Sequence, residues 1–160
     1  MNEKFGPTAL ACMKVANRLA IEHGHTHIST EHVLLAIAES KSVGQRVLES
    51  AGINNPAELK RVIFTTIPHG DTSSPENASL LPTPRLAHAI IMAKGVASKR
   101  NATKVDTGDL LCGMGHEPGC TALNLLHQMP GVDIGKIENI YQTVAAIRGS
   151  NAKPKKTVNA

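Results

Sequence analysis

The residues best suited to chemistry are gathered in one short segment, residues 22–32. Histidine and glutamate make up most of its polar positions: Glu22, His23, His25, His27, Glu31 and His32. Imidazole and carboxylate groups are good ligands of zinc and similar ions. However, the segment joins the predicted end of one helix to the start of the next, where histidines often cap carbonyl groups. We therefore predict no metal site and keep a metal-dependent small enzyme as one alternative.

No catalytic motif is present. The chain has no Gly-x-x-x-x-Gly-Lys-Ser/Thr phosphate loop, no Gly-x-Ser-x-Gly elbow and no His-Glu-x-x-His helix. Cys12, Cys112 and Cys120 are far apart and include no Cys-x-x-Cys pair, which argues against a disulfide framework and favours a reducing compartment. Cys12 falls on an apolar helix face, where a buried and inert thiol is usual. We predict no catalytic residue, no cofactor and no enzymatic activity.

The composition argues against binding to nucleic acid or to a membrane. The formal net charge is only +4, and the aromatic residues are limited to Phe5, Phe64 and Tyr141, too few to stack on bases. Residues 1–5 lack the apolar run of a signal peptide, and no stretch approaches the ~18 apolar residues that span a bilayer. We expect a cytoplasmic protein, with an organelle stroma as the other compartment. A helical nucleic-acid binder stays an alternative.

An internal repeat is the strongest organisational signal. Residues 5–35 align without a gap on the chain from Pro82 onward, and Thr30 falls on Thr107, an offset of 77 positions. Within each copy, apolar residues recur at steps of three and four, the pattern of helices that face a core. Self-similarity at a fixed offset indicates one supersecondary unit used twice. The second copy has Ala102 and Lys104 in place of His25 and His27, so it does not repeat the histidine cluster.

We expect an all-α fold of two pseudo-symmetric four-helix repeats. The predicted helices of the first repeat include residues 10–20, 33–38, 43–51 and 59–63, and those of the second include residues 86–97, 110–111, 123–126 and 134–144. The first repeat is predicted over residues 5–66 and the second over residues 83–147. Turn-forming residues at 67–82 predict a linker, and the polar residues 148–160 predict a flexible tail.

Two sets of motifs, one in each copy, carry a family resemblance. The first copy contains Gly24-His25-x-x-Ile28-Ser29-Thr30-Glu31-His32-Val33-Leu34-Leu35, and the second contains Thr83-Pro84-Arg85 and Val105-Asp106-Thr107-Gly108-Asp109-Leu110-Leu111. With these motifs, residues 5–147 resemble the duplicated amino-terminal domain of Clp unfoldases, particularly the ClpC type. The polar ending favours a complete accessory protein over the front end of a longer unfoldase.

The resemblance implies a non-catalytic protein-binding domain. Its expected partners are Clp ATPase or protease subunits, adaptor proteins and substrate proteins, and its expected role is to recruit substrates or adaptors to, or to regulate, an ATP-dependent Clp protease or chaperone. A protein-interaction module unrelated to proteolysis is the alternative.

The resemblance also implies where partners bind, namely at the starts of the first helices and at the turns before the second helices. The residues concerned are Gly6, Thr8, Glu31, His32, Thr83, Arg85 and Asp109. Some family members capture phosphoarginine, which needs helix N-terminal amides and a hydroxyl for the phosphate and a carboxylate for the guanidinium.

Each copy keeps only part of that set. The first copy has Glu31, with Gly6 where the family commonly has threonine. The second copy has Thr83 and Arg85, with Gly108 in place of the glutamate and Asp109 one residue further on. We expect Glu31 to be a solvent-facing carboxylate at a helix start. Capping of the helix starts is an equally good role for Thr8 and Thr83.

Overall fold

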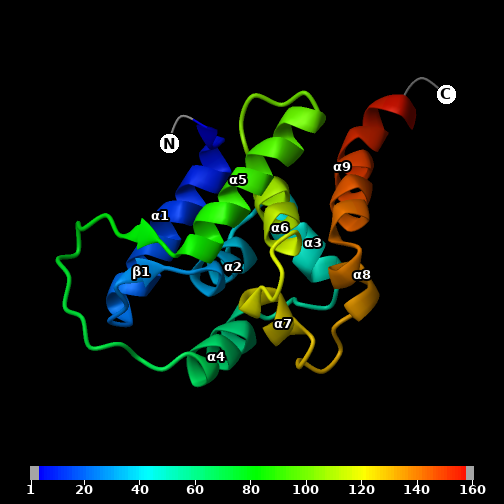
Figure 1. The fold of residues 1–160 in the computed structure, drawn as a ribbon. Helices are drawn as coiled ribbons and strands as arrows, with labels where there is room; N and C mark the ends of the chain where they lie inside the picture. Colours follow the sequence, from blue (N-terminus) through cyan, green and yellow to red (C-terminus); the bar gives the residue numbers. More distant parts are fainter. Residues whose placement is uncertain (1–3, 158–160) are drawn as a thin grey trace.

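The structure is a computed structural model that describes residues 4–157, with side chains described through residue 150. The first repeat contains α1 (Pro7–Glu22), β1 (His27–Ile28), α2 (Thr30–Glu39), α3 (Val43–Ser50) and α4 (Pro56–Thr66). The second contains β2 (Leu81–Pro82), α5 (Pro84–Lys99), α6 (Thr107–Gly115), α7 (Thr121–Leu126), α8 (Ile134–Glu138) and α9 (Ile140–Thr157). The predicted all-α class is confirmed. Figure 1 shows the chain between α4 and β2 as a long loop on one side of the molecule and α9 on the other side.

The first helices of the two repeats are built alike. Both α1 and α5 have 16 residues and begin with a proline, whose fixed φ suits the first turn. Gly24 and Asn101 follow the two helices at equivalent positions, with φ of 71° and 62°. A left-handed residue just beyond a helix is a common way to end it, and glycine and asparagine are the residues that tolerate this conformation best.

The second helices, α2 and α6, form the centre of the fold. Every residue at positions 30–38 of α2 and 107–114 of α6 is buried. These helices are therefore enclosed on all sides, whereas α1 and α5 bury one broad stripe of small and aliphatic side chains. Polar side chains at the starts of α2 and α6 must consequently find partners inside the protein.

Backbone pairing joins the two repeats in a crossed arrangement. Strands β1 and β2 pair in parallel, with Ile28 opposite Pro82, and Phe5 makes an isolated parallel bridge with Val105. Each residue of the second pair lies 77 positions from its counterpart in the first, so the two contacts are equivalent. The segment that enters each repeat therefore lies against the turn before the second helix of the other repeat. This arrangement supports the two pseudo-symmetric repeats expected from the sequence.

The C-terminal part differs from the expected pattern. The single helix predicted over residues 134–144 is wrong, because the chain leaves helical geometry at Asn139 (φ −106°, ψ 45°) and forms α8 and α9. After this break Ile140 and Val144 are buried, while Tyr141 is 51% exposed. Helix α9 continues to Thr157 and so overlaps the range predicted as a flexible tail, of which residues 158–160 lie outside the described residues.

Gly113 sets the distance between α5 and α6. A Cβ atom at this position would lie 2.2 Å from the Ala89 carbonyl oxygen and 2.9 Å from the Ala93 nitrogen. The first repeat has Ala36 at the equivalent position. Accordingly, α5 and α6 are in more extensive contact than α1 and α2.

We predict that Gly113→Ala lowers the free energy of unfolding by about 1–3 kcal/mol, the usual cost of overpacking a core. Gly95→Ala is the matched control, because Gly95 lies on the exposed side of α5 and a Cβ there meets no atom within 4 Å. The control should raise the free energy of unfolding by about 0.5–1 kcal/mol through helix propensity. Urea denaturation measures both values, and equal effects would show that α5 and α6 are not closely packed at Gly113.

Candidate functional site

Three of the predicted site residues line one hollow of about 560 Å³ between the two repeats. These are Glu31 from the start of α2 and Thr83 and Arg85 from the start of α5. The crossed pairing brings them together, because the Thr83 N–H donates to the Ile28 carbonyl oxygen at 2.8 Å. The lining of this hollow, which we call the inter-repeat hollow, consists of Ser29, Thr30, Glu31, Thr83, Pro84, Arg85, Glu117 and Thr121.

Glu31 is buried, with 6% of its surface exposed, so the expectation of a solvent-facing carboxylate is wrong. The reason is that the central helix α2 packs against α7. The Thr121 hydroxyl, at the start of α7, donates a hydrogen bond to Glu31 Oε1. Glu31 nevertheless lines the hollow.

Arg85 and Thr83, at the start of α5, also line the hollow. Arg85 is exposed, and its guanidinium makes no ion pair with any residue in the described part of the chain. Thr83 Oγ1 accepts a hydrogen bond from the Leu86 N–H at 3.2 Å, so it caps α5. The hollow thus combines a carboxylate from one repeat with a hydroxyl and a guanidinium from the other.

Asp109 lies outside the hollow and is fully buried. Arg100 donates to both carboxylate oxygens, at 2.9 and 2.7 Å, and Arg148 donates to Oδ1 at 2.9 Å. Burial alone would raise the pKa of the Asp109 carboxyl, but the hydrogen bond from Arg100, the Asp106 N–H and the charge of Arg148 bring it below its usual value. Asp109 therefore serves as an internal anion that holds α9 and the end of α5 on α6.

His32 occupies the position in α2 that Asp109 occupies in α6. It is 2% exposed, and its Nδ1 accepts a hydrogen bond from the Ser29 N–H at 2.9 Å. Burial, followed by the neighbouring His25, lowers the pKa of His32 to about 4. His32 is thus a neutral residue of the helix start and does not line the hollow.

The pseudo-symmetry defines an equivalent position in the other half of the molecule, and helix α9 covers that position. Gly108 stands where Glu31 stands, and a Cβ atom on it would lie 2.9 Å from Val144 Cγ1 and 3.0 Å from Arg148 Nη2. Gly6, at the position equivalent to Thr83, has no hydroxyl. Its N–H donates to the Val105 carbonyl oxygen at 2.8 Å.

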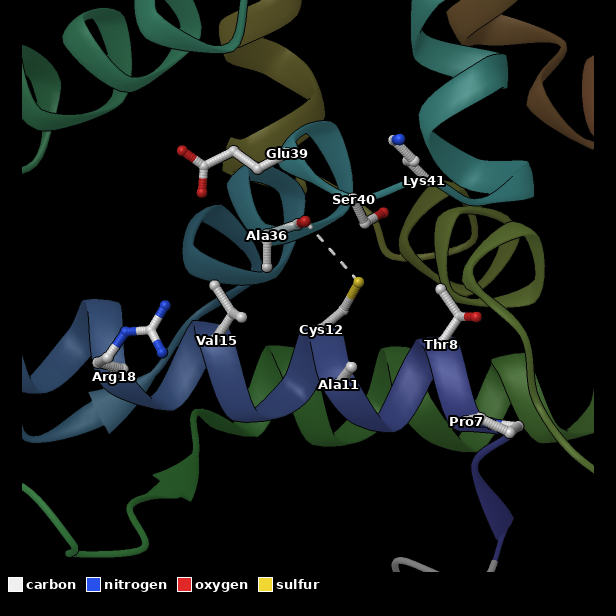
Figure 2. Close-up of a pocket in the computed structure, with 10 residues that line it drawn as sticks. All are labelled: Pro7, Thr8, Ala11, Cys12, Val15, Arg18, Ala36, Glu39, Ser40 and Lys41. Carbon is white, nitrogen blue, oxygen red and sulfur yellow. Dashed lines mark hydrogen bonds between the residues drawn. The ribbon is translucent and has the colours of Figure 1, made fainter.

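Thr8 lines a different depression, a groove of about 540 Å³ between α1 and the end of α2. Figure 2 shows Ala11, Cys12 and Val15 along α1 and Arg18 near one end of the groove. Cys12 points from α1 toward α2, and its Sγ donates to the Ala36 carbonyl oxygen at 3.8 Å. The second repeat has His88 at the position equivalent to Ala11 and Glu117 at the position equivalent to Ser40. These two side chains are hydrogen-bonded to each other.

All three cysteines are free thiols in the interior of the protein. Burial raises the pKa of the Cys12 thiol, and it raises the pKa of Cys112 to about 12, so both sulfur atoms stay protonated. Cys120 is also buried. Among the described residues, no group of three or more histidine, cysteine, aspartate or glutamate side chains is arranged to hold a metal ion. The described helices include none with the length and apolar character needed to cross a bilayer.

Sequence reasoning missed several residues of the site and its surroundings. Thr121 and Glu117 complete the hollow, but no motif distinguishes them. Arg100 and Arg148 hold Asp109, although they lie 9 and 39 positions from it in the chain. One feature of the sequence hinted at the arginines around Asp109: Gly108 replaces the expected glutamate and so leaves space for a neighbouring side chain.

Comparison with known families identifies the chain. The sequence model of the Clp repeat (R) N-terminal domain matches residues 4–144. Over 149 residues the chain is 26% identical to the negative regulator of genetic competence ClpC/MecB of Bacillus subtilis, covering 92% of this chain and 17% of that protein. It is also 26% identical to the chaperone protein ClpB of Oceanobacillus iheyensis, again over 17% of the relative. The chain thus spans about a sixth of the length of these relatives.

Solved structures share the fold. The N-terminal domain of the ClpD chaperone from Arabidopsis thaliana superposes with a TM-score of 0.71 at 14% identity, covering 89% of this chain and 98% of that one. The N-domain of ClpV from Vibrio cholerae gives a TM-score of 0.69 at 16% identity, with 90% and 87% covered. A complex of the ClpV N-domain with a VipB peptide gives 0.61 at 17% identity, with 90% and 89% covered.

We predict that Asp109→Ala lowers the free energy of unfolding by about 3 kcal/mol. This value is the lower end of the usual cost of breaking a buried ion pair, because Arg100 and Arg148 keep partial contact with water. The matched control is Glu58→Ala, which removes the carboxylate of the exposed Glu58–Arg61 pair. Exposed pairs contribute little, so the control should leave the urea midpoint essentially unchanged. Similar losses in the two variants would show that the buried network is not a major source of stability.

Proposed function

We propose a function from one premise: this chain belongs to the Clp repeat (R) N-terminal domain family, whose model matches residues 4–144. On that premise we infer that it is a non-catalytic protein-binding domain that brings partner or substrate proteins to an ATP-dependent Clp chaperone or protease. A complex of the ClpV N-domain with a VipB peptide supports this role, because it shows a domain with the same fold bound to a peptide.

The observation that carries the proposal is the composition of the inter-repeat hollow. Arg85, Thr83 and the first turn of α5 favour an anion, since a guanidinium, a hydroxyl and a helix N-terminus all attract negative charge. Glu31, from the other repeat, lines the same hollow and supplies a carboxylate for a cationic group. A ligand that suits the hollow therefore carries both charges close together, and phosphoarginine on a partner protein is such a group.

The proposed binding surface is built from both repeats, and together they supply all three groups that such a ligand requires. Neither repeat has the hydroxyl, the guanidinium and the carboxylate together, but the crossed pairing places Glu31 of the first repeat near Thr83 and Arg85 of the second. Binding at this place consequently depends on the relative position of the two repeats, which the backbone hydrogen bonds maintain.

We predict that Arg85→Ala weakens the binding of a peptide carrying phosphoarginine by roughly tenfold or more, because a charged hydrogen bond contributes about 1.5–3 kcal/mol. Arg61→Ala is the matched control, since it removes another exposed arginine, whose partner, Glu58, lies on the same helix α4. Isothermal titration calorimetry measures both affinities. If the two variants bind alike, Arg85 does not contact the ligand.

We predict that Glu31→Gln preserves the fold and weakens binding of the same peptide, because glutamine still accepts the Thr121 hydrogen bond but lacks the negative charge. Glu138→Gln on the exposed face of α8 is the control and should bind normally. Helical circular dichroism and urea denaturation report the fold, and calorimetry reports the affinity. Normal binding by Glu31→Gln would assign this carboxylate to helix capping.

The proposed partner class is tested separately, with the intact chain as bait in native lysate and Arg85→Ala as comparison. Clp ATPase or protease subunits, or their adaptors, should be recovered. Recovery of other proteins in their place, lost in Arg85→Ala, would assign the domain to an interaction outside proteolysis.

A further inference from the structure

An arginine of the chain itself closes onto two carboxylates in the second half of the molecule. Arg148 of α9 donates through Nη2 to Asp106 Oδ1 at 2.6 Å and to Asp109 Oδ1 at 2.9 Å. The same nitrogen lies over Gly108, since a Cβ atom on that glycine would be 3.0 Å from it. Charged hydrogen bonds between guanidinium and carboxylate groups are among the strongest in proteins. We call Asp106, Gly108 and Asp109, the residues that receive this guanidinium, the Arg148 site.

The carboxylates of the Arg148 site keep hydrogen bonds when Arg148 is absent. Arg100 donates to both oxygens of Asp109, at 2.9 and 2.7 Å. The Asp109 N–H donates to Asp106 Oδ1 at 2.9 Å, and Arg100 Nη2 lies 3.3 Å from Asp106 Oδ2. Each carboxylate oxygen therefore has a partner besides Arg148. Consequently, Arg148 can leave the site without leaving a buried acceptor unpaired.

The charge and the accessibility of the site suit a cation that comes from solvent. Without Arg148, the ion pairs in the described part of the chain leave Arg100 as the cation for both carboxylates. One negative charge is then in excess and attracts a positive group. The side chains of Asp106 and Arg148 are 33% and 24% exposed, so the site is open to solvent on one side.

Arg148 itself fits the site incompletely. Its Nε–H is buried and has no acceptor among the described residues. A buried donor without a partner is costly, so this cost is removed when the side chain moves into water. Helix α9 does not depend on Arg148 alone, because Ile140 and Val144 are buried against the rest of the protein. The side chain can thus move out while the helix stays in place.

The second half lacks the groups that favour a phosphate in the inter-repeat hollow. Gly6 and Thr8 stand at the positions equivalent to Thr83 and Arg85, so the hydroxyl and the guanidinium of the hollow have no counterparts there. A ligand for the Arg148 site therefore carries a guanidinium group without a phosphate. Arginine suits it better than lysine, because the planar guanidinium presents its donors in a fixed arrangement that matches carboxylates.

We propose that the Arg148 site is a second binding site of this domain, which takes an unmodified arginine side chain of another protein and which Arg148 occupies in its absence. Arg148 thus acts as an internal competitor that a partner's arginine displaces. The site is independent of the inter-repeat hollow. That the arginine belongs to a partner protein rests on the protein-binding function proposed above.

Nuclear magnetic resonance titration of the full chain with N-acetylarginine amide tests the site. The amide signals of Asp106 and Asp109 report binding there, and those of Ser29 and Thr83 report the hollow. Arg148→Ala should bind the probe at Asp106 and Asp109 roughly tenfold or more tightly than the unmodified chain, because an internal competitor lowers the apparent affinity by the fraction of open sites. Arg61→Ala, which removes an exposed arginine of α4, is the control and should bind like the unmodified chain.

Two further comparisons test the chemistry of recognition. N-acetylcitrulline amide has nearly the same shape as the probe but no charge, and it should leave the signals of Asp106 and Asp109 unchanged. Asp106→Asn, introduced together with Arg148→Ala, should abolish binding of the arginine probe at this site. Asparagine is as good a helix N-cap as aspartate, so the start of α6 is preserved while one charge is removed.

Several results would overturn the proposal. Equal affinities in Arg148→Ala and the unmodified chain would show that Arg148 does not compete for the site. Shifts confined to Ser29 and Thr83 would assign arginine binding to the hollow. Arg148→Met keeps the aliphatic part of the side chain and serves as the second variant, with circular dichroism as the test of folding. If neither variant folds, or if folded variants do not bind the probe, Arg148 is a structural residue only.

Failure of the proposed function gives a different result. A phosphoarginine peptide that leaves the signals of Ser29 and Thr83 unchanged would count against the hollow. The signals of Asp106 and Asp109 in Arg148→Ala would still decide the second site.

Discussion

Two equivalent backbone hydrogen bonds are the constraint on which the rest of the structure depends. The Gly6 N–H donates to the Val105 carbonyl oxygen and the Thr83 N–H donates to the Ile28 carbonyl oxygen, both at 2.8 Å. Each bond attaches the entry of one repeat to the turn before the central helix of the other. Because of this crossing, the first turn of α5 lies near the first turn of α2, and the inter-repeat hollow arises there.

Small differences between the two repeats give them different surfaces. Gly113 allows α5 and α6 a contact that Ala36 does not allow α1 and α2, and the first repeat keeps the groove of Figure 2. Gly108 leaves space beside α6 that Arg148 and Val144 of α9 fill, whereas Glu31 keeps a side chain at the equivalent place. The duplicated fold therefore offers two unlike depressions in place of two copies of one site.

Most of the helices and the duplication could be predicted from the sequence, because both follow from local patterns of residues. Apolar spacing, the prolines at helix starts and the offset of 77 positions between Thr30 and Thr107 are all visible without a structure. The composition of the site was only partly predictable. Alignment of the copies pairs Glu31 with Gly108, whereas the hollow joins Glu31 to Thr83 and Arg85, and only the crossed pairing reveals that combination. The burial of Glu31 was also missed, because an apolar stripe does not show that α2 is enclosed on all sides.

The central helices show two solutions to the same physical problem. Each has a polar side chain fully enclosed at its third position, and an enclosed polar group must be paired. Asp109 keeps its charge because Arg100 and Arg148 neutralise it, and Arg148 can reach it because Gly108 has no side chain. In the first repeat Glu31 stands at the position equivalent to Gly108, and the enclosed residue His32 is a neutral imidazole hydrogen-bonded to the imidazole of His25. Burial and the neighbouring His25 keep His32 neutral even though Glu31 beside it favours a charged ring, so the two repeats satisfy the same enclosed position with different charge states.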